Sequence, residues 1–215
     1  MTEEEWLVCA DPKPMLKVVK EGVSERKLRL FAVACCRNVG HLIEGECDRN
    51  AIEVAERVAD GLASNKERRT ALHASGSGAV ASATLYADVG IMVGFVRQRI
   101  AEEVARSSGT HAVGQASYVW DATYALPDPA QSILLRDIFG NQFRSITADP
   151  AWLTDTAVSL ARGMYESRDF SAMPILADAL QDAGCDNTDM LNHCRDASAT
   201  HVRGCWVVDL VLGKS

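Results

Sequence analysis

Five residues with thiol or imidazole side chains lie close together near the carboxyl end of the chain. They fall within 21 positions and are Cys185, His193, Cys194, His201 and Cys205. Zinc in proteins is held by such ligands, usually four in a tetrahedral arrangement with deprotonated sulfurs. The spacing lacks the Cys-x-x-Cys pair of common zinc modules, and the neighbours His193 and Cys194 would point about 100° apart on a helix. The pattern therefore allows a zinc site, with buried thiols and hydrogen-bonded histidines as the plainer interpretation.

The same segment contains a cysteine and histidine pair that could act as a nucleophile and its base. Cys205 would be the nucleophile, activated by His201 or His193, and Asp209 would orient the imidazole. The apolar neighbours of Cys205 predict a raised thiol pKa, which disfavours the reactive thiolate. We therefore assign no catalytic residue and keep a Cys/His enzyme as an alternative only.

A predicted loop over residues 140–148, with motifs before and after it in the sequence, carries planar and charged side chains. The residues of these segments that could contact a ligand or partner are Arg136, Asn141, Phe143, Arg144, Trp152 and Arg203. Irregular segments on rigid helices often carry function, and arginine pairs well with acidic or planar groups. Ion pairs with nearby aspartates within the chain are the alternative interpretation.

Two further motifs favour structural interpretations. Residues 76–81 fit Gly-x-Gly-x-x-Ala, but the residues before them are helical in character, whereas a dinucleotide-binding loop follows a strand. A helix kink or a close helix crossing is expected there instead. An acidic run surrounds Gly184 and consists of Asp178, Asp182, Asp186 and Asp189. This run lacks the ligand order of a calcium-binding loop and is typical of a solvated helix face with caps.

Composition excludes several classes of function. The chain has 215 residues, 47% of them hydrophobic, and a formal charge of -7, which is enough material for a core without disulfides. An acidic chain is a poor partner for nucleic acid, whose binding needs clustered lysine and arginine. The acidity is concentrated in residues 108–215, with thirteen acidic against seven basic residues. We predict no signal peptide and no membrane span, hence a cytoplasmic protein with reduced cysteines.

Helix signals occur throughout the chain. Thr2 and Glu5 form a capping box for a helix over 3–9, and Ser24 is placed to cap a helix that buries Phe31 and Cys35 and exposes Arg29 on its opposite face. Asp48 is placed to cap another helix, whose predicted buried stripe is Ile52, Ala55, Ala59 and Leu62. Further helices are predicted over 111–126, 133–139, 154–167, 172–183, 188–195 and 203–212, with another starting at Asp149-Pro150 and with Gly184 and Gly213 as stops. We predict an all-α, irregular bundle of eight to ten helices, forming one domain over 1–215 with a subdivision near 107–130.

Several motifs give the chain a specific resemblance. They are Leu134–Arg144, Asp149–Thr154, Leu176–Leu180 with Ala183–Cys185, His201–Leu210, Lys27–Arg37 and Ala55–Gly61. In these segments the chain resembles an uncharacterised bacterial family of small helical proteins. The likeness weakens over about 63–125, and it implies a helical fold without any activity, cofactor or catalytic residue.

These observations favour a non-catalytic, cytoplasmic module that binds another protein through a helical groove and an acidic surface. No cofactor is required by this interpretation. The alternative is a zinc-binding protein, or a Cys/His enzyme, that uses the cluster near the carboxyl end.

Overall fold

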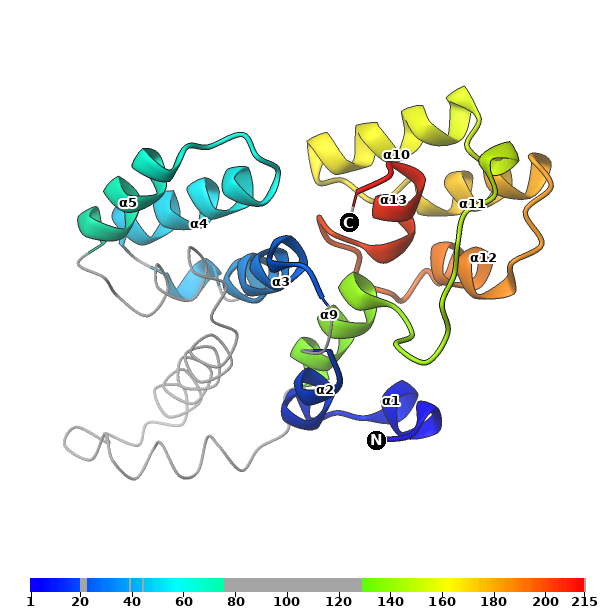
Figure 1. The fold of residues 1–215 in the computed structure, drawn as a ribbon, viewed down its shortest axis with the longest axis horizontal. Helices are drawn as coiled ribbons and strands as arrows, with labels where there is room; N and C mark the ends of the chain where they lie inside the picture. Colours follow the sequence, from blue (N-terminus) through cyan, green and yellow to red (C-terminus); the bar gives the residue numbers. More distant parts are fainter. Residues whose placement is uncertain (20–22, 39, 44, 76–128, 215) are drawn as a thin grey trace. The chain divides into compact units, whose positions relative to one another are not determined.

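The computed structural model describes all residues except 20–22, 39, 44, 76–128 and 215. In this part of the chain every regular element is a helix, which confirms the all-α prediction (Figure 1). The chain divides into two compact units, one formed by Met1–Val8 with Ile133–Ser215 and the other by Cys9–Ser132. The predicted helix over 111–126 and the glycine motif over 76–81 lie outside the described residues, as does nearly all of the predicted subdivision.

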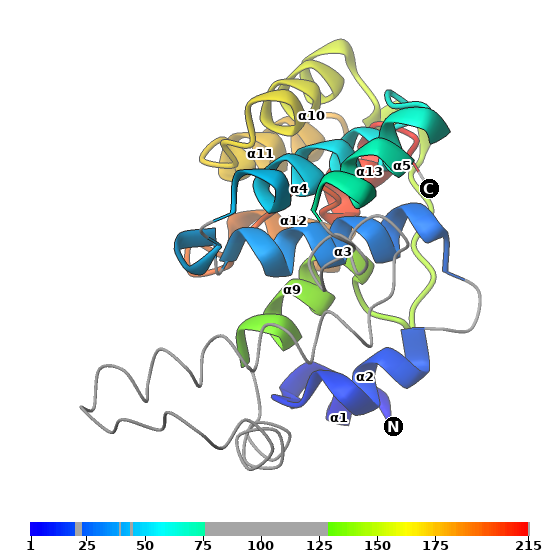
Figure 2. The same cartoon turned by 90° about the vertical axis from the view of Figure 1, so that its left-hand side faces the viewer.

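The unit over Cys9–Ser132 contains α2 (Pro12–Val19), α3 (Glu25–Asn38), α4 (Glu46–Ala59) and α5 (Asn65–Ala74). A single 3-10 turn, Gly40–Leu42, follows α3. Helix α4 packs against α3 and also against α5, and the three can be followed together in Figure 2. The buried residues of α4 include Ile52, Ala55 and Ala59, as its apolar spacing predicts.

Helix α3 is buried on more than one face. Its residues from Arg29 to Cys36 are all buried, so the prediction of an exposed arginine face is wrong for Arg29, which is only 5% exposed. The Arg29 guanidinium lies 3.6 Å from the Glu25 carboxylate one turn earlier, which compensates part of its charge. Small residues such as Ala32, Ala34 and Cys36 allow neighbouring elements to approach the helix from several sides.

The caps of this unit are partly as predicted. The Ser24 hydroxyl accepts from the Lys27 backbone N–H at 3.4 Å, as the sequence indicates. Asp48 does not cap α4, because the N-cap residue is Gly45. Leu62 is 66% exposed and lies beyond the end of α4, so its predicted place in the buried stripe is also wrong. Because α4 ends at the Asp60 C-cap, the helical repeat does not extend to Leu62 and does not determine whether this side chain faces the core.

The unit that holds the carboxyl end contains α1 (Glu3–Val8), the 133–139 part of α9 (Pro129–Phe139), and four further helices, α10 (Asp155–Ser167), α11 (Met173–Asp182), α12 (Thr188–Arg195) and α13 (Trp206–Val211). Figure 1 shows α11 beside α10 and α12. Apolar side chains from α10–α13 form one core, which includes Met164, Leu176, Leu180, Met190 and Val207. This packing holds α12 against α13, next to the site described below.

Local hydrogen bonds explain where these helices start and stop. Thr2 and Glu5 make the predicted capping box, with bonds of 2.8 and 3.2 Å. The side chain of Asn187 accepts from the Met190 N–H and so starts α12. Gly184 follows α11 and Gly213 follows α13, both with positive φ, a conformation that costs glycine little.

The helix expected at Asp149-Pro150 is a shorter element than predicted. Asp149 caps as expected, but the turn is a 3-10 helix over Pro150–Trp152. Helix α10 begins only after Thr154, whose hydroxyl accepts from the Ala157 N–H. Among the described helices, none has the length and apolar character that crossing a membrane requires.

Candidate metal centre

Four side chains from three segments of the carboxyl-terminal unit meet below its surface. Asp137 belongs to α9 and His193 to α12. His201 lies in the connection between α12 and α13, and Cys205 is the N-cap residue of α13. One ligand atom from each residue lies within 4.8 Å of the other three, the one such group of metal-binding side chains found among the described residues.

The contacts within this cluster centre on a single carboxylate oxygen. Asp137 Oδ1 lies 2.8 Å from His201 Nδ1 and 3.2 Å from His193 Nε2. The same His193 Nε2 lies 3.2 Å from Cys205 Sγ. The second oxygen, Asp137 Oδ2, accepts from the Val202 backbone N–H at 2.9 Å. The backbone bond fixes the carboxylate and leaves Oδ1 directed at the two imidazoles.

This geometry differs from that of a Cys-His-Asp catalytic triad. In a triad the imidazole uses one ring nitrogen for the nucleophile and the other for the carboxylate. Here one nitrogen, Nε2 of His193, faces both Cys205 Sγ and Asp137 Oδ1. One proton or lone pair on that nitrogen cannot satisfy both neighbours well. A cation among the four atoms would satisfy all of them together, because each can offer it a lone pair.

The charge of Asp137 also calls for a cation. Its side chain is 3% exposed and contacts His193, His201 and the Val202 N–H, with no lysine or arginine among its partners in the described structure. Burial acts to raise the pKa of Asp137, but the hydrogen bonds from His193 and His201, together with the positive charge these imidazoles carry when protonated, hold that pKa below the usual value. A buried ionised carboxylate needs a paired charge or a metal ion.

The spacing of the four atoms approaches that of zinc ligands. Zinc bonds of about 2.0–2.3 Å to nitrogen, oxygen and sulfur place tetrahedral ligand atoms about 3.3–3.6 Å apart. Three of the six atom pairs lie at 2.8–3.2 Å and would open by a few tenths of an ångström. The other pairs lie within 4.8 Å, and the widest would have to close by about 1 Å on binding. With neutral imidazoles, Zn²⁺ balanced by one carboxylate and one thiolate gives a site with no net charge, which suits burial.

Neighbouring groups hold the imidazoles in place. The two histidine rings meet edge to face with centroids 4.8 Å apart, and the Trp206 ring packs 5.3 Å from that of His193. Gly140 backs this tryptophan so closely that a Cβ there would lie 3.1 Å from Trp206 Cγ. His201 Nε2 is buried without a hydrogen-bond partner in the described structure. His201 also lines a cavity of about 410 Å³ with Cys194, Asp196 and Ser171.

The sequence identified three of these four residues. It predicted His193, His201 and Cys205, together with Cys185 and Cys194, which the structure leaves outside the group. Cys185 and Cys194 are buried, at 3% and 1% exposure. Burial and then the charge of Asp137 raise the pKa of Cys194 to about 12. These two thiols behave as buried apolar side chains, in agreement with the plainer interpretation.

Asp137 was missed because it is distant in sequence from the other three residues. The one local signal is an aspartate among the buried residues Leu134, Leu135 and Ile138 of one helix. A carboxylate at a core position is rare without a partner. That partner belongs to a segment 64 positions later, which no local pattern indicates.

The structure gives little support to the nucleophile interpretation. Cys205 is 0% exposed, and burial, followed by the charge of Asp137, raises its pKa well above the usual value. This agrees with the raised pKa that the sequence predicts. The acid beside the imidazoles is Asp137, whereas Asp209 was expected in that role.

The residues proposed for ligand contact make bonds within the unit. Arg136 donates to the Trp6 carbonyl, Asn141 donates to Glu3, and Arg144 pairs with Glu3 and Asp189. Arg203 donates to the Tyr165 carbonyl and lies over the Tyr165 ring. Trp152 packs on the apolar core, and Phe143 is 42% exposed. A ligand-contact role for these residues stays a prediction.

In the acidic run, Asp178 pairs with Arg195 and Asp189 pairs with Arg144.

Comparison of the chain with protein-family models, curated proteins and solved structures found no significant match. The bacterial family resemblance therefore stays a prediction, and the function is argued from the geometry of the site.

Proposed function

We propose that this chain is a zinc-binding protein that holds one ion through Asp137, His193, His201 and Cys205. The single observation that carries the proposal is the convergence of four ligand atoms, from the buried Asp137 and Cys205 and the partly buried His193 and His201. The carboxylate oxygen at its centre has no lysine or arginine partner among the described residues. The mixture of one sulfur, two nitrogens and one oxygen favours zinc over magnesium or calcium, which prefer oxygen ligands alone.

The role that these residues support best is structural. Four protein ligands fill a tetrahedral zinc, whereas catalytic sites keep one position open for water or substrate. The ligands come from α9, α12, the α12–α13 connection and the start of α13, so the ion would tie these elements together. Val202 would then hold the carboxylate from the second sphere, as partners of metal ligands commonly do.

The experiment is metal analysis of the purified full chain beside two matched cysteine variants. Cys205→Ala removes a proposed ligand, and Cys194→Ala removes a buried thiol of similar exposure that is outside the group. We expect about one zinc per chain in the wild type and in C194A, and none in C205A. Cobalt added to the metal-free proteins should give sulfur-to-cobalt charge-transfer absorption in the wild type and in C194A, but not in C205A.

A second variant, Asp137→Asn, tests the residue on which the charge argument rests. It keeps the shape of the side chain but removes the charge, and we expect zinc affinity to fall by more than about a hundredfold, beyond the effect of losing a second-sphere partner. A wild type that binds neither zinc nor cobalt and still has its full helical content would refute the proposal. Equal metal content in C205A and C194A would refute it as well.

A further inference from the structure

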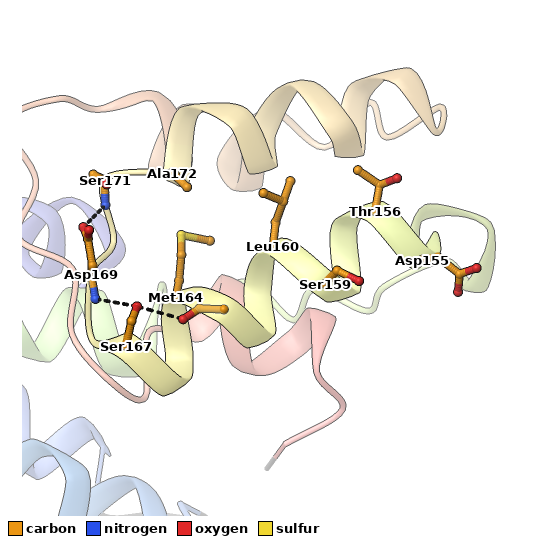
Figure 3. Close-up of a pocket in the computed structure, with 10 residues that line it drawn as sticks. Asp155, Thr156, Ser159, Leu160, Met164, Ser167, Asp169, Ser171 and Ala172 are labelled. Atoms are coloured by element: carbon orange, nitrogen blue, oxygen red, sulfur yellow. Dashed lines mark hydrogen bonds between the residues drawn. The ribbon is translucent and has the colours of Figure 1, made fainter.

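Helix α10 forms one wall of an open groove in the carboxyl-terminal unit. The groove has a volume of about 660 Å³ and continues to the start of α11. Figure 3 shows Asp155 at one end of α10 and Asp169 just past the other, with Leu160 and Met164 between them. The groove therefore has an apolar middle and a carboxylate at each end.

The middle of the groove has room for another backbone. Ser159, Gly163 and Ser167 line it at steps of four residues along α10, so these small side chains share one face of the helix. A Cβ added at Gly163 would meet no atom within 4 Å. The Ser167 hydroxyl already donates to the Gly163 carbonyl and accepts from the Asp169 N–H. Small residues at this spacing let a second helix pack closely, ridge into groove.

The charge of the groove has one sign. Asp155 and Asp169 are the charged residues among those that line it, and both side chains are exposed. The neighbouring Arg168 does not line the groove, although it lines an adjacent cavity to which Asp169 also belongs. Hydrogen bonds from Ser171, first from its backbone N–H, hold the pKa of Asp169 below its usual value, so this carboxylate is charged at neutral pH.

We infer that this groove is a docking site for a basic amphipathic helix of another protein. The helix would lay an apolar stripe over the partly buried Leu160, beside the core residue Met164, and place one lysine or arginine near each aspartate. The 13 residues of α10 span about 20 Å, so basic residues about 14 positions apart on a parallel or antiparallel helix, which share one face of that helix, would reach both carboxylates. The inference goes beyond metal binding and does not depend on it.

The test is selection of 18-residue peptides from a randomised phage-displayed library on the full chain. Bound phage are counter-selected on Gly163→Leu, which fills the groove and favours the helix. We expect enriched peptides with an apolar stripe and basic residues about 14 positions apart. Synthetic copies should bind wild type and the control Glu166→Leu equally, since Glu166 is exposed on α10 outside the groove, and bind G163L at least tenfold more weakly.

Charge-removing variants distinguish a specific effect of Asp155 and Asp169 from the effect of the negative charge of the whole surface. The double variant D155N/D169N should weaken peptide binding by about threefold to tenfold, as expected for two exposed ion pairs, and Asp182→Asn on α11 should not change it. Three results would overturn the inference: no peptide that depends on Gly163, enriched peptides without basic residues, or a groove covered by a second copy of the chain in solution. Zinc content measured on the same samples keeps this result separate from the metal proposal.

Discussion

Alanine at Gly140 should destabilise the carboxyl-terminal unit through two separable effects. Gly140 has a φ of +64°, and a residue with a Cβ pays about 1–2 kcal/mol in this left-handed region. The new Cβ would also lie 3.1 Å from Trp206 Cγ and 3.2 Å from Cδ2. Crowding of this kind inside a packed region typically costs a further 1–3 kcal/mol. Gly140→Ala should therefore lower the free energy of unfolding by about 2–5 kcal/mol.

Gly213 provides a matched control in the same unit. It has the same φ of +64°, and a Cβ there would meet nothing within 4 Å. Gly213→Ala should therefore cost about 1–2 kcal/mol, the backbone contribution alone. The difference between the two variants measures the contact with Trp206, which packs on His193. Because of that contact, G140A should also weaken zinc binding, and G213A should leave it unchanged.

The assay is equilibrium urea unfolding of metal-free protein, followed by circular dichroism and by tryptophan fluorescence. Coincident transitions would justify a two-state analysis for each variant. Equal losses of stability in G140A and G213A would show that the Trp206 contact contributes nothing. A loss below about 0.5 kcal/mol in G140A would refute the backbone argument as well.

Three smaller predictions concern the unit over Cys9–Ser132. Ser64→Ala removes the capping box of α5 and should cost about 1 kcal/mol in urea unfolding; an unchanged midpoint would contradict the cap assignment. Hydrogen bonds from Ser64 lower the pKa of Glu67, so its stabilising contribution is present above the unfolded pKa and disappears as the pH falls through the folded pKa. An NMR titration should show Glu67 titrating below an ordinary glutamate in wild type and returning toward the usual value in S64A. Burial raises the pKa of Cys36 to about 12, so iodoacetamide at pH 8 should label exposed Cys47 long before Cys36; mass spectrometry reporting equal rates would contradict the burial.

The helices of this protein follow from local sequence wherever local chemistry determines them. Caps such as Thr2 with Glu5, and Ser24, act within three residues, and they appear in the structure as predicted. Gly184 and Gly213 ended helices for the same reason, since a positive φ is a local demand. Asp149-Pro150 starts an element as predicted, although that element is only a 3-10 turn, and Thr154 caps α10 within the predicted range 154–167.

The burial of Arg29 and the position of Asp137 could not be predicted in this way. Both are polar residues in helices, where a periodic pattern alone assigns them to the solvent side. Their environment is set by other elements that pack around them, and for Asp137 by His201, 64 positions away. Nearness in the sequence had the opposite effect for Cys185 and Cys194. It suggested that both thiols join His193, His201 and Cys205, whereas in the structure they lie outside the group. Residue type was therefore enough to predict three of the four proposed ligands. The fourth, Asp137, is identified only in the folded structure.

Because Asp137 and His201 are far apart in the sequence, the ribosome synthesises them at different times. At roughly 5–20 residues per second, Asp137 is synthesised several seconds before His201 and Cys205. During that interval α9 carries a carboxylate without its eventual neighbours, so the growing polypeptide has no ion-binding pocket to fill. Capture of zinc would thus wait until translation has delivered the start of α13.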